Sequence, residues 1–200
     1  MKLKGIAALC KKNKWANVFQ EYGNDTELVQ YIGDGTAFYQ VNNLPNLDKE
    51  SLLTIFEIPE KQWGSWLVQV NEIPAGIDFS DATTEERVVQ QLEPAIIYNE
   101  KTLLPLQTQK GIVFLDSKYL LPLSDVLDIL SLFERKTKTG QTYIVAKAGL
   151  MLKAVIAPKD IITTRFIEQL EELAKECACS LSQKEKEQTV RIDTTTGEII

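Results

Sequence analysis

The hydrophobic pattern at the start of the chain has helical spacing. Leu3, Ile6, Ala7 and Cys10 stand at positions i, i+3, i+4 and i+7, which predicts a helix with one apolar stripe. A second, short helix is predicted between Asp48 and Pro59, and its apolar face would consist of Leu52, Leu53 and Phe56. Both helices are short and amphipathic, so we expect each to cover a sheet with one side only.

Between and after these helices the pattern favours strands. The stretches ANVFQEY (16–22), LVQYIGDGTAFYQV (28–41) and GSWLVQV (64–70) are rich in β-branched and aromatic residues. The centre of the second stretch, Gly33-Asp34-Gly35, could be a phosphate-binding loop or the turn of a β-hairpin. A phosphate loop needs a helix after the glycines, whereas TAFYQV predicts a strand. We therefore expect a hairpin turn with Asp34 exposed to water.

The second half of the chain follows a similar plan. Residues 95–116 predict two or three short strands, and residues 141–158 predict a hairpin that turns at Ala148-Gly149. A helix is predicted between them, capped by Ser124 or Asp125 and ending before Gly140, with an apolar stripe of Val126, Leu127, Leu130 and Phe133. A fourth helix is predicted from Thr163 or Thr164, and the residues expected to face the core are Phe166, Ile167, Leu170, Leu173 and Ala174.

This order of elements predicts an α+β fold with two tandem halves, each an antiparallel sheet with two helices. The first half is expected at 1–75 and the second at 94–180. The acidic, turn-rich residues 76–93 are interpreted as a linker or an excursion loop. Residues 181–200 are interpreted as a polar C-terminal tail with one short strand at 189–200.

Composition narrows the possible chemistry. The 200 residues are 44% hydrophobic and 25% charged, and no apolar run reaches the roughly 20 residues that span a bilayer, so we expect a cytoplasmic protein without a membrane partner. The chain contains no histidine, which removes Ser-His-Asp and Cys-His catalysis and histidine metal ligands. Cys10, Cys177 and Cys179 do not suit a disulfide framework and are expected to be buried thiols. We therefore expect a non-enzymatic protein without a cofactor or a metal.

One enzymatic alternative stays open at this level. Asp125 and Asp128 stand three residues apart in the predicted third helix, and such carboxylates can hold magnesium. Glu168, Glu171 and Glu172 form a similar group in the fourth helix. A water-exposed helix face explains both groups equally well.

Charge is distributed unevenly along the chain. The net charge is −6, yet residues 1–20 and 135–159 contain lysine and arginine without any acid, while residues 48–100 are strongly acidic. Such segregation indicates one positive surface on a negative body, as expected for a protein that touches a polyanion with one face. The candidate DNA-backbone contacts are Lys4, Lys11, Lys12, Lys14, Arg135, Lys136 and Lys138.

The stretches MKLKGIAALCKKNK, IGDGTAFY and YIVAKAGLMLKAVIAPKD resemble an uncharacterised protein family of Firmicutes prophages and mobile elements. The paired halves are also similar in architecture to DNA sliding clamps, whose helices line a ring and present lysine and arginine to DNA. This resemblance implies a processivity factor that contacts duplex DNA without reading its sequence, cooperates with a DNA polymerase or other replication proteins, and forms a homo-oligomer, namely a trimeric ring. The first alternative is a protein–protein interaction module, such as a phage accessory factor, without DNA binding, and the second is the magnesium-dependent enzyme on nucleic acid.

Overall fold

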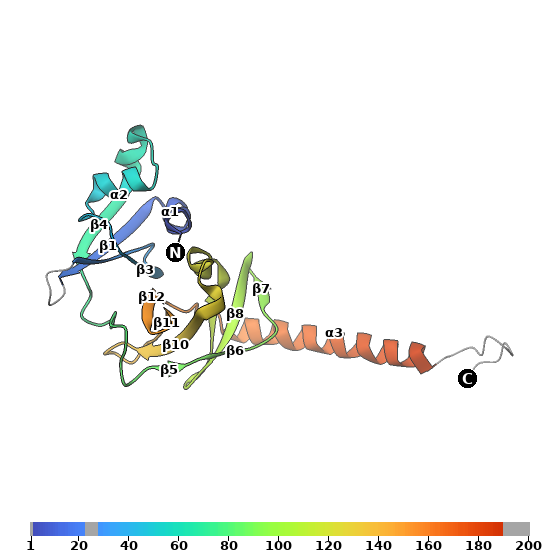
Figure 1. Cartoon of the computed structure of the whole chain (residues 1–200). Coiled ribbons are helices and arrows are strands. Elements are labelled where there is room, and N and C mark those ends of the chain that lie inside the picture. Colours follow the sequence, from blue (N-terminus) through green and yellow to red (C-terminus); the bar gives the residue numbers. More distant parts are fainter. Residues whose placement is uncertain (1, 23–27, 190–200) are drawn as a thin grey trace. The chain divides into compact units, whose positions relative to one another are not determined.

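The structure is a computed structural model that describes residues 2–22 and 28–189, and it confirms the α+β class (Figure 1). The chain forms two compact units, residues 1–159 and residues 160–200. The first unit, here called the body, contains every strand of the described residues. The helices of the body are α1 (Leu3–Lys11) and α2 (Lys49–Ile55), with the 3₁₀ helices η1 (Glu60–Ser65), η2 (Ser117–Leu123) and η3 (Leu127–Ile129).

A mixed eight-stranded sheet organises the body. Its order is β4-β1-β2-β3-β12-β11-β10-β5, and every neighbouring pair is antiparallel except β1 and β4, which are parallel. The strands are β1 (Trp15–Tyr22), β2 (Leu28–Gly33), β3 (Ala37–Val41), β4 (Leu67–Glu72), β5 (Arg87–Val88), β10 (Leu130–Lys136), β11 (Thr142–Ala148) and β12 (Met151–Ile156). In a smaller sheet, β8 (Lys101–Thr108) pairs with β6 (Gln90–Gln91), β7 (Ile96–Tyr98) and β9 (Gly111–Asp116).

The strand order repeats outward from the centre of the large sheet. From β3 the neighbours are β2, β1 and β4, and from β12 they are β11, β10 and β5. Each series follows a helix, because α1 precedes β1 and η2 precedes β10 with η3 between them. Each series thus contains three antiparallel strands, but β4 pairs parallel with β1 whereas β5 pairs antiparallel with β10. The two series form one continuous sheet through the pairing of β3 with β12.

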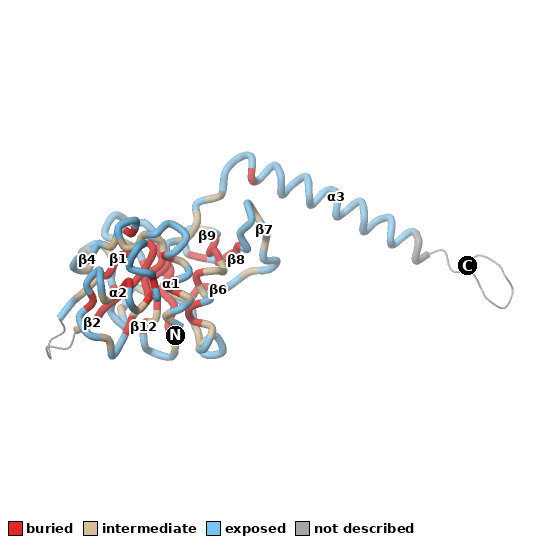
Figure 2. Tube along the Cα trace, turned by 90° about the horizontal axis from the view of Figure 1, so that it is seen from above, coloured by how far each residue is buried: buried red, intermediate tan, exposed pale blue. Residues whose placement is uncertain are grey.

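One face of the large sheet carries the main hydrophobic core. Ala16, Val18, Ile32 and Tyr39 point to this face and are completely buried. They pack with Ile6, Ala7 and Cys10 of α1, Leu52 and Leu53 of α2, Leu106 and Leu115 of the smaller sheet, and Tyr119 and Leu123 of η2. The predicted apolar stripes of the first two helices are thereby confirmed, and Figure 2 shows the buried chain gathered in the body.

The opposite face is covered by an extended segment without regular secondary structure, residues 73–86, which we call the strap. Phe79 packs there on Tyr31 and Phe38, together with Tyr143 and Val145 of β11. The Tyr31 hydroxyl donates a hydrogen bond to the Phe79 carbonyl oxygen at 3.2 Å. The acidic segment that the sequence suggests as a linker or loop therefore begins as a loop that lies on the sheet.

The Gly33-Asp34-Gly35 stretch forms the turn between β2 and β3, so the hairpin prediction is confirmed. The prediction for Asp34 is wrong, because this side chain is only 8% exposed. Its Oδ1 accepts hydrogen bonds from the backbone N–H groups of Thr36 and Ala37, at 3.0 and 3.1 Å, and its Oδ2 accepts one from the Tyr119 hydroxyl at 3.2 Å. Asp34 thus closes the turn and also binds the hairpin to η2.

The predicted α-helix after Ser124 is wrong. Its residues form η3 and then strand β10, which pairs along its whole length with β11. The hairpin of β11 and β12, which is confirmed, offers an open edge to this segment, and strand pairing outweighs the helical spacing of its apolar residues. Asp125 and Asp128 therefore do not share a helix face, and the described residues contain no cluster of three or more acids or cysteines suited to a metal.

The fourth predicted helix is confirmed as α3 (Thr164–Thr189), and it extends into the predicted tail. Its predicted core face is wrong except for Phe166, since Ile167, Leu170, Leu173 and Ala174 are exposed. In Figure 2 the described part of α3 is exposed apart from a buried stretch near its start. The predicted strand at 189–200 lies outside the described residues except for Thr189, which is helical. No helix in the described part of the chain is long and apolar enough to cross a membrane.

The three cysteines differ in exposure, so the prediction of three buried thiols holds only for Cys10. Burial, with a smaller contribution from the charge of the nearby Asp34, raises the pKa of Cys10 to about 12, so this thiol is not ionised near neutral pH. We expect the disulfide reagent DTNB to modify Cys177 and Cys179 rapidly in the native protein and Cys10 only after denaturation. Rapid release of a third thiolate from the native protein would contradict the buried position of Cys10.

Candidate functional site

The first group of predicted site residues lies on and just after α1. Lys4, Lys11, Lys12 and Lys14 are all exposed, while the other side of the helix is buried in the core. The helix contains no acid, and none of the four lysines forms an ion pair with a described residue. The Lys14 ammonium donates only to the Ser65 hydroxyl, at 3.4 Å. The surface of α1 is therefore a patch of positive charge that is available to an anion.

The second predicted group divides. Lys136 and Lys138 are exposed, and the Lys136 ammonium donates to Oε1 of Gln109 at 2.8 Å. Arg135 is only 2% exposed, so it does not lie on the surface as a DNA contact requires. In a strand, adjacent side chains point to opposite faces of the sheet. The sequence could not separate Arg135 from Lys136 in this way, because it predicts a helix at these residues. Arg135 points to the strap, and its role is structural.

Arg135 and Lys147 hold the strap through one carboxylate. Both cations bind Glu86: Arg135 through Nε at 3.0 Å and through Nη2, and Lys147 through Nζ at 2.6 Å. Arg135 Nη1 also donates to the carbonyl oxygens of Asp78 and Ser80, at 3.1 and 2.8 Å. Burial tends to raise the pKa of Glu86, but hydrogen bonds from Lys147 and Arg135 outweigh it and lower the pKa.

A third group of cations surrounds Tyr119 of η2. The Lys118 and Lys159 ammonium groups lie 4.6 and 5.8 Å from the centre of the Tyr119 ring. Burial lowers the pKa of Lys159, and the charges of Lys101 and Lys118 lower it further, whereas Asp116 and Asp34 raise it. Lys118 also forms an ion pair with Asp116 at 3.8 Å. The Lys2 N–H donates a hydrogen bond to the Pro122 carbonyl oxygen at 2.8 Å, and η2 contacts α1. Lys118 and Tyr119 of η2 therefore lie on the same side of the large sheet as α1. The lysines of this third group are too far apart in the sequence to be recognised as a group.

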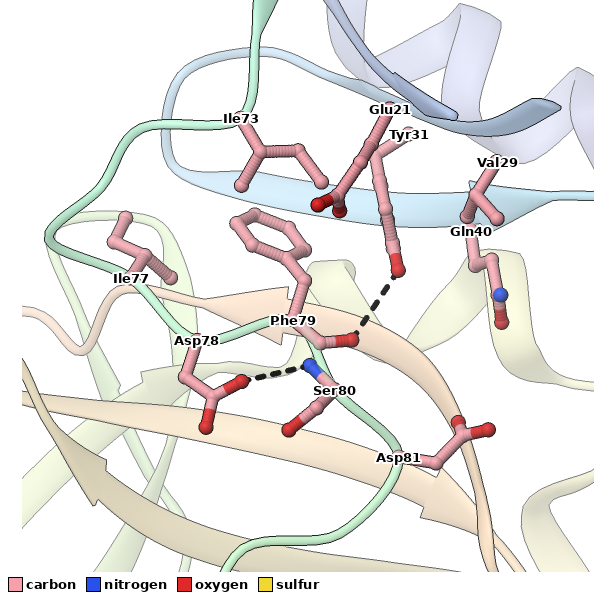
Figure 3. A pocket seen from close by; sticks show the side chains of 10 residues that line it. All are labelled: Glu21, Val29, Tyr31, Gln40, Ile73, Ile77, Asp78, Phe79, Ser80 and Asp81. Carbon is pink, nitrogen blue, oxygen red and sulfur yellow. Dashed lines mark hydrogen bonds between the residues drawn. The ribbon is translucent and has the colours of Figure 1, made fainter. Parts of the chain in front are cut away.

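On the opposite face of the sheet, the strap and strands β1–β3 enclose a hollow of 390 Å³, shown in Figure 3. Its apolar lining is formed by Val29 and Tyr31 of β2 and by Ile73, Ile77 and Phe79 of the strap. Its polar lining is formed by Glu21, Gln40, Asp78, Ser80 and Asp81. The hollow thus combines aromatic and aliphatic walls with three carboxylates.

The body therefore presents two different faces. The α1 patch lies on the face that carries the main core, and the strap with its acids covers the other face. Comparisons of this chain with protein-family models, with curated proteins and with solved structures find no match. Any functional conclusion therefore depends on the surface chemistry of the described residues.

Proposed function

We propose that this protein is a non-enzymatic, clamp-type DNA-binding protein that contacts the backbone of duplex DNA through α1. The observation that carries the proposal is the exposure of Lys4, Lys11, Lys12 and Lys14 on one acid-free segment of a chain whose net charge is −6. Lysine ammonium groups bind phosphates as point charges and do not read bases. Such contacts suit a protein that holds DNA and slides along it.

The internal repeat supports the clamp part of the proposal. Each half contributes a helix followed by three antiparallel strands, and the helices α1 and η2 lie together on one face of a continuous sheet. A ring built from such units would place its helices toward the DNA and its sheets outward. We infer a homo-oligomeric ring, with three chains as the expected number, that works with a DNA polymerase or another replication protein in the cytoplasm.

A charge-reversal variant tests the DNA contact. The double substitution Lys11→Glu and Lys12→Glu should weaken binding to a fluorescent duplex of arbitrary sequence by at least about tenfold at low salt. The slope of log K against log salt should fall by about two, since each phosphate contact contributes close to one. Fluorescence anisotropy at several salt concentrations gives both quantities.

The matched control is Lys49→Glu with Lys61→Glu, which makes the same charge change at exposed positions of α2 and η1. This control should bind DNA nearly as the wild type does. Equal losses in the two double variants would contradict a specific role for α1. A strict monomer in multi-angle light scattering that does not bind DNA would contradict the clamp proposal as a whole.

The acid-lined hollow favours a second candidate function, a protein–protein interaction module. In that case the face with the strap carries the function, and the Lys11→Glu and Lys12→Glu variant retains full activity in the phage or host context. The two functions are compatible, because the α1 patch and the hollow lie on opposite faces of the sheet.

A further inference from the structure

A second hollow adjoins the hollow beneath the strap. The neighbouring hollow has a volume of 510 Å³ and shares Glu21 and Ile73 with the first. It adds Val70 and the end of β4 at Glu72, together with Tyr22, whose ring is 69% exposed. We call the two hollows together the strap groove. Two adjoining hollows suit an extended segment of chain better than a compact small molecule.

The charges along the strap groove have one sign. Among the described residues that line the two hollows, the charged ones are Glu21, Glu72, Asp78 and Asp81, and none is a lysine or an arginine. Asp78 lies 3.8 Å from Arg135 Nη1, and Asp81 accepts a hydrogen bond from the Leu152 N–H at 2.7 Å. Glu21 and Glu72 are exposed and form no ion pair with a described residue. These two carboxylates are therefore the ones available to a ligand.

Two uncharged side chains of the first hollow, Tyr31 and Gln40, are also affected by its polar surroundings. Burial raises the pKa of the Tyr31 phenol, and the charges of Asp81, Glu21 and Asp78 raise it further. The Gln40 side chain also lines the first hollow, and its Oε1 is buried without a hydrogen-bond partner among the described residues. Carboxylates and an amide oxygen all accept hydrogen bonds, so the best ligand is a positively charged donor.

The apolar part of the groove restricts the ligand further. The Tyr31 and Phe79 rings, whose centres are 4.5 Å apart, are only 3% and 7% exposed. The apolar wall open to a ligand therefore consists of Ile73, which lies next to the Phe79 ring in Figure 3, and of Val70 and Tyr22, which are 41% and 69% exposed. A polyamine or a metal ion would leave this wall without a partner, and a nucleic acid would be repelled by the carboxylates. A peptide can supply ammonium or guanidinium groups and an apolar side chain together.

We propose that the strap groove binds an extended, lysine- and arginine-rich segment of a partner protein. An apolar side chain of that segment packs against Ile73, Val70 and Tyr22, and the flanking cations pair with Glu21 and Glu72. The partner thereby occupies the face of the sheet opposite to the α1 patch, so the same molecule can hold DNA and the partner at once. Binding to the partner does not depend on DNA binding.

The test uses a fluorescein-labelled peptide in which arginine and lysine flank a leucine and a phenylalanine. We expect saturable binding to the full chain, weakened by about tenfold or more in Glu21→Lys, because one attractive pair becomes a repulsive one. The matched control Glu60→Lys changes an exposed acid of η1 outside the groove and should bind as the wild type does. Glu72→Lys is a second variant, and it should lose affinity in the same direction.

Two further measurements make the result decisive. A peptide with serine in place of leucine and phenylalanine should bind at least about tenfold more weakly, whereas equal binding would overturn the apolar contact. Spermidine, added at the same total positive charge as the peptide, should not displace the labelled peptide. Full displacement would show that the groove binds any small polycation and would overturn the proposal. Equal losses in Glu21→Lys and Glu60→Lys, or no saturable binding, would also overturn the proposal. Because Glu21→Lys should bind DNA like the wild type, a failure here is distinguishable from a failure of the DNA proposal.

Discussion

Substitution of Glu86 by alanine is expected to lower the free energy of unfolding of the body by about 3 kcal/mol or more. The reason is the loss of the single carboxylate that binds both Arg135 and Lys147, whose side chains are 2% and 4% exposed. Without it, Lys147 stays buried with no opposite charge among the described residues, and Arg135 keeps only the more distant Asp78 carboxylate, at 3.8 Å. Removal of one partner of a buried pair costs far more than the pair contributes. Urea unfolding followed by tryptophan fluorescence measures the change, since Trp15, Trp63 and Trp66 all lie in the body.

The control for this prediction is Glu85→Ala, which removes an exposed carboxylate from the adjacent position and should change stability by less than about 0.5 kcal/mol. Glu86→Gln keeps a hydrogen-bond acceptor for the two cations, so its loss of unfolding free energy should lie between those of Glu86→Ala and Glu85→Ala. The pH dependence has a fixed sign, because folding lowers the pKa of Glu86. The contribution of Glu86 to the free energy of unfolding is present above the pKa that this group has in the unfolded chain. It is lost as the pH falls through the pKa that the group has in the folded protein. A Glu86→Ala protein as stable as Glu85→Ala would show that the strap is not held by this carboxylate.

The second large effect is expected at Gly33, where alanine should destabilise the body by about 3 kcal/mol or more. A Cβ atom at this position would lie 1.9 Å from the Ala37 carbonyl oxygen and 2.7 Å from Cδ1 of Phe38. The oxygen belongs to the backbone of the hairpin and accepts the Asp34 N–H at 3.2 Å, so relief of the clash would break the turn. Differential scanning calorimetry or urea unfolding of the Gly33→Ala protein gives the loss directly.

Gly76 provides the matched control in the same protein. No atom lies within 4 Å of a Cβ placed there, and its backbone is not in the left-handed region. Gly76→Ala should therefore be neutral or slightly stabilising, because alanine reduces the freedom of the unfolded chain. If both alanine variants had the same stability, the close approach of β2 and β3 at this turn could not be correct.

Local sequence patterns predicted several elements of this fold. The helical spacing from Leu3 to Cys10 and the glycine-centred hairpins were sufficient because each contains its own turn or stripe within a few residues. Residues 124–136 were mistaken for a helix because their apolar side chains fit both periods. The edge of β11 decides between them, and that edge is a tertiary feature with no signal in the local sequence.

The candidate sites show the same division. The α1 lysines could be found in the sequence because a single short segment carries them all. Arg135 could not be assigned correctly, because its burial depends on Glu86, which comes from the distant acidic segment. The residues of the strap groove were also missed, since Glu21, Gln40 and Phe79 come from three separate elements that only the folded sheet brings together. The absence of histidine limits catalytic chemistry but does not indicate a binding surface.

The strap has a consequence for how the body folds. Its residues contact Tyr31 from one half of the large sheet and Arg135 and Lys147 from the other, so it can take its place only after β3 has paired with β12. That pairing joins residues 37–39 to residues 154–156, and contacts of such high sequence separation slow folding. We therefore expect the strap to complete its contacts late in folding, and to couple the two series of strands into one cooperative unit.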